Sequence, residues 1–123
     1  MKALLVISHG SRRDESNMEV QRLTDTVRPL VSERFGIVEA AFLELASPLI
    51  PDGISLCISQ GAKEILILPY FLAAGRHVAE DIPEIVAASQ KRHPDVSMTI
   101  APHLGGSELM AEFLAGSACL PQE

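Results

Sequence analysis

Four short runs of mainly aliphatic residues recur along the chain, separated by longer and more polar segments. They occupy residues 3–8, 38–43, 64–69 and 96–101. A strand that is apolar along most of its length is buried on both faces, as in a parallel sheet that helices cover on both sides. The hydrophobic pattern therefore predicts four parallel strands at these positions.

The segment after the first run has the period of an amphipathic helix. We expect this helix over residues 15–35, with Gly36 closing it. Pro29 is a difficulty inside it, because proline lacks a backbone donor, and we expect a kink or a break near Arg28. The apolar positions that recur at three- and four-residue steps are Val20, Leu23, Val27, Leu30 and Val31.

Three more helices are predicted between and after the remaining runs. The second is expected over residues 51–60. The third is expected over residues 81–92, because Asp81 is a good cap and Pro83 suits a first turn. The fourth is expected over residues 107–116, capped by its first residue, a serine. The side chains that it should bury are Leu109, Met110, Phe113 and Leu114.

The order of predicted elements is βαβαβαβα. Because parallel crossovers are right-handed, this order gives a three-layer α/β/α domain around a central four-stranded parallel sheet. We expect a single domain over residues 1–116 and a frayed C-terminal tail over residues 117–123.

Several chemically active residues follow the predicted strands directly. His9, His77 and His103 come after the first, third and fourth strands, and Glu44 comes after the second. In open parallel sheets, ligands bind beyond the carboxyl ends of the strands. We therefore expect these four residues at one edge of the sheet. His93 falls at the opposite edge and is interpreted as a solvated loop residue.

Histidine and carboxylate together suit a divalent metal such as iron, cobalt, nickel or zinc. Glu44 stands between apolar neighbours, and a buried carboxylate is costly unless it is paired or binds a cation. A salt bridge to an arginine is the structural alternative, and a lone histidine after a strand is often only a hydrogen-bonded loop residue. The spacing contains no compact metal motif, so the metal hypothesis depends on the inferred fold.

Positive charge gathers at the same predicted edge. Arg12 and Arg13 follow the first strand, and Arg76 lies in the segment 70–80, which is long for a connection between a strand and a helix. Long ordered loops in compact domains are commonly functional. Arginine binds carboxylates through its planar fork, so these residues are candidates for an acidic ligand, although solvated loop arginines are the alternative.

The composition fits one globular domain. Of the 123 residues 47% are hydrophobic, which excludes a disordered chain. The formal net charge is -6 and aromatic residues make up 4%, whereas nucleic-acid binding uses a broad basic face or stacking platforms. No run approaches the ~20 apolar residues that a bilayer crossing requires. We therefore expect no nucleic-acid partner and no membrane partner.

The two cysteines give an indication of the cellular compartment. Cys57 lies in an apolar stretch and is expected in the core, while Cys119 lies near the C-terminus and is expected to be free. They form no close-spaced pair, which favours a reducing compartment over secretion. The apolar start of the chain is too short for a signal peptide and has no cleavage site. We therefore expect a cytoplasmic protein.

Three segments resemble the motifs of the sirohydrochlorin chelatase family, in order. The first is Ser8-His9-Gly10-Ser11-Arg12. The second covers residues 41–48, Ala-Phe-Leu-Glu-Leu-Ala-Ser-Pro. The third covers residues 69–78, Pro-Tyr-Phe-Leu-Ala-Ala-Gly-Arg-His-Val, followed by Asp81-Ile82-Pro83. Each motif alone is moderately specific, and the three together are strongly specific. The length resembles the short, single-repeat form of the family.

The resemblance implies a class II chelatase fold and a lyase that inserts cobalt, iron or nickel into sirohydrochlorin with release of two protons. Such enzymes serve the routes to cobalamin, siroheme or the nickel tetrapyrrole coenzyme. The divalent metal (Co2+, Fe2+ or Ni2+) is a substrate, no organic cofactor is implied, and the short form usually works as a homodimer. The implied metal and catalytic positions are His9, Glu44 and His77, with Ser11, Arg12, Arg13 and Arg76 as candidates for binding the substrate carboxylates.

Two other functions fit parts of the pattern. A carrier could bind the metal or the tetrapyrrole in the same pocket without accelerating insertion. A histidine phosphatase also has His-Gly after its first strand, but its histidine follows an arginine, and here that position is Ser8. His103 is outside the family's core positions and is left as an auxiliary residue.

Overall fold

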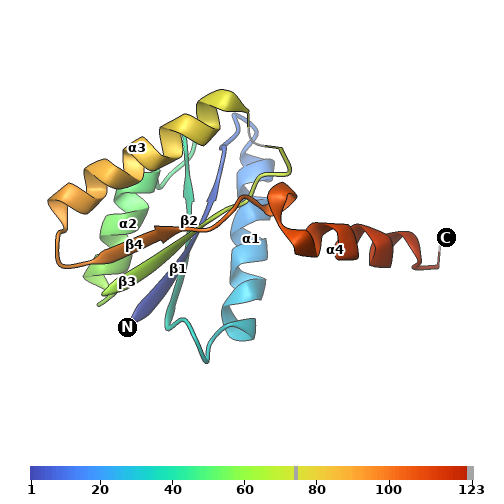
Figure 1. The fold of residues 1–123 in the computed structure, drawn as a ribbon, viewed down its shortest axis with the longest axis horizontal. Helices are drawn as coiled ribbons and strands as arrows, with labels where there is room; N and C mark the ends of the chain where they lie inside the picture. Colours follow the sequence, from blue (N-terminus) through green and yellow to red (C-terminus); the bar gives the residue numbers. More distant parts are fainter. Residues whose placement is uncertain (74, 122–123) are drawn as a thin grey trace.

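The computed structural model describes residues 1–73 and 75–121, without the side chain of His77. Strands and helices alternate along the chain, as the sequence predicted (Figure 1). Their bounds are β1 (Lys2–Ser8), α1 (Asp14–Leu30), β2 (Ile37–Phe42), α2 (Ile50–Ser59), β3 (Glu64–Pro69), α3 (Arg76–Arg92), β4 (Ser97–Ile100), the short 3-10 helix η1 (Leu104–Gly106) and α4 (Glu108–Ala118).

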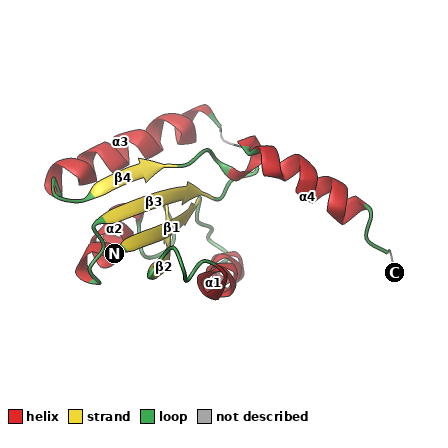
Figure 2. Ribbon diagram, turned by 60° about the horizontal axis from the view of Figure 1, so that its bottom comes forward, coloured by secondary structure: helices red, strands yellow, loops and turns green. Residues whose placement is uncertain are grey.

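The four strands form one parallel sheet in the order β2-β1-β3-β4. Each strand begins and ends within one residue of its predicted limits, so the predicted parallel sheet is confirmed. Because the sheet is parallel, all four strands end at the same edge. Helices lie on both sides of it, which gives the expected α/β/α layers (Figure 2).

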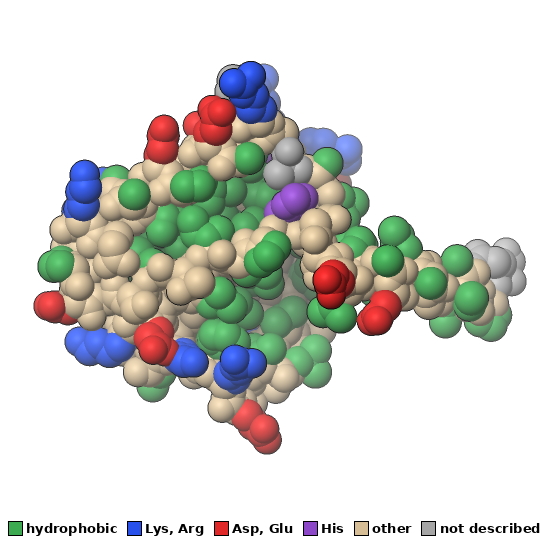
Figure 3. Space-filling view, viewed as in Figure 1, with side chains coloured by type: hydrophobic (Ala, Val, Ile, Leu, Met, Phe, Trp, Pro, Cys, Tyr) green, Lys and Arg blue, Asp and Glu red, His purple; other side chains and the backbone are tan. Residues whose placement is uncertain are grey.

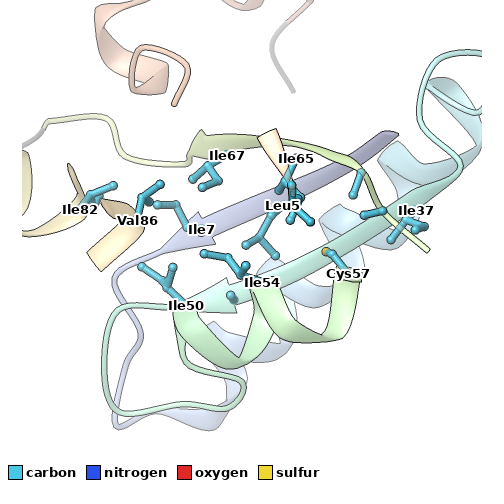
Figure 4. Close-up of a cluster of buried hydrophobic side chains, with 14 of the residues drawn as sticks. Leu5, Ile7, Ile37, Ile50, Ile54, Cys57, Ile65, Ile67, Ile82 and Val86 are labelled. Carbon is cyan, nitrogen blue, oxygen red and sulfur yellow. The ribbon is translucent and has the colours of Figure 1, made fainter. Parts of the chain in front are cut away.

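The face of the sheet under α2 and α3 holds the main core (Figure 4). Alternate side chains of the central strands point into it and are fully buried, among them Leu5, Ile7 and Ile67. Cys57 of α2 lies in the same core, as predicted. Burial, and secondarily the nearby charge of Glu39, raises the pKa of this thiol to about 12.

The opposite face is covered by α1 over β2 and β1 only. Here Leu4 and Val38 are buried against apolar residues of α1 and the turn after it. On the same face, Leu66 and Leu68 of β3 are half-buried, and Thr99 of β4 is exposed. Within the described residues, no helix packs closely over this β3–β4 half of the face.

The first helix is shorter than predicted. It ends at Leu30 instead of residue 35, one residue after Pro29, whose ring removes a backbone donor within the last turn. Two of the apolar positions that mark the helical period, Leu23 and Leu30, do not face the core, since they are 41% and 78% exposed. The other three positions, Val20, Val27 and the C-terminal cap Val31, lie on the side toward the sheet together with the buried Thr24.

Arg28 near the end of α1 has a structural role. Its Nε and Nη2 both donate to the backbone oxygen of Val38, at 3.2 and 2.8 Å, and its Nη1 pairs with Asp25 at 2.8 Å. Val38 lies in β2, which is an edge strand of the sheet. The arginine therefore ties the helix to this edge.

The third helix begins earlier than predicted, at Arg76 instead of Asp81. Gly75 is its N-terminal cap, and the Ala79 N–H donates to the Gly75 oxygen at 3.0 Å. Pro83 lies inside the helix, where its ring removes one backbone donor. The buried side chains of Ile82 and Val86 keep the helix on the sheet in spite of that loss.

The fourth helix is capped by Ser107 as predicted, with the Leu109 N–H donating to its hydroxyl at 3.2 Å. It ends at Ala118, two residues beyond Gly116, and extends sideways from the body of the molecule (Figure 1). Its prediction as a core helix is wrong. Met110 is half-buried, but Leu109, Phe113 and Leu114 are exposed. None of the helices in the described ranges has the length and apolar character needed to cross a membrane.

Candidate functional site

His9 and Glu44 lie side by side at the carboxyl edge of the sheet. The Leu43 N–H donates to the Ser8 oxygen at 2.9 Å, and the Glu44 N–H donates to the His9 oxygen at 3.1 Å. Parallel pairing of β1 with β2 thus continues into the two loops. The edge placement predicted for these two residues is confirmed.

Gly10 allows the two loops to approach this closely. Its φ of 90° lies in the left-handed region, and a Cβ atom at this position would collide with the backbone oxygen of Glu44. In the other loop, Leu45 has a φ of 65°, which is uncommon for a residue with a side chain. Both loops therefore hold constrained backbone beside the candidate residues.

A hollow of ≈ 720 Å³ opens between these loops and the start of α3. His9 and Glu44 line it from the β1 and β2 sides, and Arg76 and Asp81 line it from α3. Phe71 forms part of the wall, and its ring meets the His9 ring edge-on, with centroids 6.4 Å apart and an interplanar angle of 75°. The hollow therefore combines imidazole, carboxylate and guanidinium groups with an aromatic wall.

The setting of Glu44 differs from the sequence-based expectation. Its side chain is exposed at the mouth of the hollow instead of buried among its apolar neighbours. The ion pairs between described residues do not include Glu44, so the salt-bridge alternative gains no support. An exposed carboxylate is hydrated and free to meet an incoming cation.

The other histidines occupy different places. Position 77 lies in the first turn of α3, and its side chain is outside the described part of the structure. Among the described residues, no three His, Cys, Asp or Glu side chains gather closely enough to hold a metal ion. His103 lies at the same edge but lines a separate hollow of ≈ 190 Å³ on the α3 side, which shares Phe71 with the first. His93 lies at the opposite edge, as expected, but it is the half-buried C-terminal cap of α3 instead of a fully solvated loop residue.

The predicted substrate-binding residues lie at the same end of the molecule. Arg12 and Arg13 are exposed, and Arg13 pairs with Glu15 at 3.5 Å. Arg76 is exposed and pairs with Glu80 at 3.4 Å. Such exposed pairs are worth little and open easily, so both guanidinium groups remain available to an acidic ligand.

Ser11 is held by its own loop. Its hydroxyl accepts a hydrogen bond from the Arg13 N–H at 3.0 Å. Asn17 of α1 brackets its backbone, with Oδ1 accepting from the Ser11 N–H at 2.9 Å and Nδ2 donating to the Ser11 oxygen at 2.8 Å. The hydroxyl proton of Ser11 can still be donated to a ligand, so the residue can both shape the loop and bind.

Sequence reasoning missed Phe71, Asp81 and Asn17 as parts of the site. Asp81 was interpreted as a helix cap because the helix was expected to begin there. Its position one turn after residue 77 in a helix beginning at Arg76 would have placed it at the hollow. Asn17 carried no local signal, because its role depends on the fold of the loop before it.

Comparison with known proteins gives consistent matches. A model of the CbiX family matches residues 3–118. The chain is 38% identical over 111 residues to the chloroplastic sirohydrochlorin ferrochelatase of Arabidopsis thaliana. It is 37% identical over 93 residues to the sirohydrochlorin cobaltochelatase of Methanocaldococcus jannaschii. These matches cover 90% and 76% of the chain.

The chain is shorter than these relatives. It spans 48% of the Arabidopsis protein and 64% of the Methanocaldococcus protein, so about half to two thirds of their length. Among solved structures, SirB from Bacillus subtilis with Fe3+ superposes with a TM-score of 0.82 at 27% identity. That match covers 99% of this chain and 49% of SirB. The fold of the whole chain is therefore repeated in about half of a larger protein.

Proposed function

The chain belongs to the CbiX family, and on that premise we propose that it is a metal chelatase that inserts a divalent metal ion into sirohydrochlorin. The named relatives are chelatases of this tetrapyrrole with iron or cobalt as the metal. Because the chain spans only part of their length, the proposal rests on its own site as well as on its relatives.

The observation that carries the proposal is the hollow of ≈ 720 Å³ that His9 and Glu44 line together. It is open to solvent at the edge of the sheet, and one wall is aromatic. A flat macrocycle needs an open, partly apolar site, and the metal needs nitrogen and oxygen ligands that hold it loosely. This hollow offers both within one cleft.

The chemistry replaces two pyrrole N–H protons by one divalent cation, so two protons must leave for each metal inserted. Histidine is the residue type that can both accept a proton and, in its neutral form, ligate a metal, and the chain offers His9 and His77 for these tasks. The exposed carboxylate of Glu44 attracts the hydrated cation to the hollow and accepts protons from the ring nitrogens. We assign these three residues the metal-binding and catalytic roles.

The substrate carries many carboxylates, which the arginines at this edge can bind. Arg76 lines the hollow itself, while Arg12 and Arg13 lie on the loop after β1. Ser11 adds a hydroxyl donor on the same loop. Cobalt, iron and nickel all suit the proposed ligands, and the reaction as written needs no organic cofactor.

The proposal includes a homodimer in a reducing, cytoplasmic compartment. The family resemblance implies the dimer, and both cysteines are free, with Cys57 buried and Cys119 exposed. Free thiols are typical of a reducing compartment.

A direct assay tests the function. Purified protein is mixed with sirohydrochlorin and with Co2+, Fe2+ or Ni2+ in turn, and insertion is followed by absorbance against the uncatalysed rate. His9→Ala and His77→Ala should each lower the rate at least ~100-fold, the usual scale of a lost general base. His93→Ala, at the opposite edge, is the matched control and should keep the wild-type rate.

Full activity in both the position 9 and position 77 variants would refute the mechanism. Binding of the metal or the tetrapyrrole without acceleration of insertion would favour a carrier.

A further inference from the structure

His103 lies at the carboxyl edge of the sheet but outside the hollow that His9 and Glu44 line. It follows β4, and its side chain is half-buried. Among the described residues, this side chain takes part in no hydrogen bond or ion pair. An imidazole ring that is partly buried and binds nothing in its own chain is available to a ligand.

The turn that follows His103 sets the position of its ring. The Gly106 N–H donates to the His103 backbone oxygen at 3.0 Å and closes η1. A Cβ atom at position 106 would lie 2.9 Å from the His103 Cε1 and 3.3 Å from both ring nitrogens, so the imidazole lies directly against this glycine. The Gly105 N–H donates to the Phe71 oxygen at 2.9 Å. The same turn therefore fixes the imidazole next to the loop that carries Phe71.

The hollow that His103 lines adjoins the larger hollow of the candidate site. Its volume is ≈ 190 Å³, and apart from His103 its lining residues are apolar and come from the end of β3, the first half of α3 and the end of β4. Phe71 and Val78 line both hollows. The smaller one has the volume of about six water molecules at ~30 Å³ each, which admits a short side arm of a ligand and not its ring.

Positive charge is missing from the β4 side of this edge. No Lys or Arg occurs after Arg92, and His103 is the one residue in 94–123 of a type that can carry positive charge. The projecting helix α4 accordingly shows hydrophobic and acidic side chains and no Lys or Arg in Figure 3. The arginines proposed to bind the substrate come from the loop after β1 and from the start of α3. Carboxylates on the opposite side of a bound macrocycle therefore need another partner.

We propose that the His103 hollow binds one short carboxylate arm of the tetrapyrrole. The aliphatic stem of the arm lies against the apolar lining, and its carboxylate accepts a hydrogen bond from the imidazole, a charge-assisted contact. The inference rests on the proposed function, because it takes the tetrapyrrole as the ligand of the larger hollow. Held by His103 on one side and by the arginines on the other, the macrocycle is kept in one orientation beside His9 and Glu44.

The first experiment measures the affinity for metal-free sirohydrochlorin by absorbance titration, without metal and therefore without turnover. His103→Phe keeps an aromatic ring against Gly106 but removes the donor, and it should raise Kd about 10-fold, the scale of a lost hydrogen bond to a charged group. His103→Gln keeps a donor and should stay within about 3-fold of the wild type. His93→Phe is the matched control at the opposite edge, also half-buried, and should bind like the wild type.

The second experiment fills the hollow and leaves the imidazole in place. Ala101 lines the hollow at the end of β4, so Ala101→Leu should also raise Kd several-fold. Because this change and His103→Phe remove the same contact, the double variant should lose no more affinity than the weaker-binding single variant. Ala87→Leu, at an exposed position of α3 outside both hollows, is the control. Thermal unfolding of each variant checks that it remains folded.

Wild-type affinity in the His103→Phe protein would overturn the proposal. Equal losses in the His103→Gln and His103→Phe proteins, or additive losses in the double variant, would overturn it as well. A protein that binds sirohydrochlorin in a His103-dependent manner but inserts no metal would refute the proposed function and leave this subsite standing. Metal insertion with unchanged binding in the His103 variants would overturn the subsite alone, and a wild type that does not bind sirohydrochlorin would overturn both.

Discussion

The two faces of the sheet differ in how completely they are covered. On the α2–α3 face, the alternate residues of β1 and β3 are fully buried under two helices. On the α1 face, one helix covers β2 and β1, while β3 and β4 remain partly open. Helix placement and strand composition both differ between the faces, because β4 turns Met98 and Ile100 to the covered face and Ser97 and Thr99 to the open one. The covered face contributes most of the buried apolar core, and the open half contributes less.

The candidate site lies at the edge where the two faces meet. Its residues are on loops after β1 and β2, which the covered core holds in place, and on the start of α3. A rigid sheet with functional loops at its carboxyl edge is the usual arrangement of such domains. The same substitution made on each face of the sheet tests how much each face contributes to stability.

The largest difference is expected from a matched pair of leucines. Leu5 is fully buried on the covered face, whereas Leu66 is half-buried on the open half. Leu5→Ala should lower the free energy of unfolding by about 3–4 kcal/mol, because it removes buried methyl groups and leaves a cavity. Leu66→Ala should cost only about 1 kcal/mol in the monomer, since part of its side chain is already in water.

Urea denaturation of both variants measures this difference. Equal losses of stability in the two variants would show that the open half is covered in the isolated protomer.

Two glycines within helices should respond in opposite ways to the same substitution by alanine, with smaller changes in the free energy of unfolding than the leucine pair. A Cβ atom at Gly53 of α2 would lie 2.7 Å from the Ala41 Cβ and 3.3 Å from Leu5 Cδ1, so Gly53→Ala should destabilise the protein by about 1–2 kcal/mol. At Gly116 of α4 nothing lies within 4 Å, and Gly116→Ala should stabilise the helix by about 0.5–1 kcal/mol.

Thermal unfolding of the two glycine variants provides the measurement, with hydrogen exchange of α4 amides as the local measurement for Gly116→Ala. A stabilised Gly53→Ala protein would contradict the close approach of α2 to the sheet.

The two cysteines of the unmodified protein should differ in their reactivity toward a maleimide. The thiolate is the reactive form, and with a pKa of about 12 the buried Cys57 is almost entirely protonated at pH 8. A maleimide should therefore label Cys119 quickly and Cys57 only after unfolding, as mass spectrometry of the modified peptides can report. Rapid labelling of Cys57 in the folded protein would mean that α2 leaves the sheet often.

The raised pKa of Cys57 also predicts how the stability of the folded protein changes at alkaline pH. In the unfolded chain the thiol ionises near its ordinary pKa of 9.0, whereas in the folded protein it holds its proton to about 12. The folded state therefore binds more protons between these pH values, and stability falls as the pH rises through this window. Cys57→Ala should remove this part of the fall.

Much of the fold was predictable because its strands are nearly continuous apolar runs. Placement of His9 and Glu44 at one edge followed from parallel topology, which sends the ends of β1 and β2 to the same side. The start of α3 was predicted wrongly, because Asp81 and Pro83 are local signals for a first turn. Val78, one turn before Ile82, packs against the same core and belongs to the helix.

The hydrophobic pattern did not predict two features, the exposure of α4 and the exposure of Glu44. An apolar stripe on residues 107–118 predicts that one side of the helix needs a partner, but it does not say which surface supplies it. In the same way, the apolar neighbours of Glu44 indicated a buried strand end, whereas the left-handed backbone of Leu45 lies in a loop that leaves the carboxylate exposed.

The outer edge of β2 has a consequence for how copies of this chain associate. Its backbone oxygen at Val38 already accepts two hydrogen bonds from Arg28, and the Phe42 N–H already donates to the Pro48 oxygen at 2.8 Å. An edge strand with free backbone groups invites a strand of another molecule and, with it, open-ended aggregation. With both of these β2 groups engaged, end-to-end extension of the sheet is disfavoured on this side, and association is directed to closed contacts through helices and sheet faces.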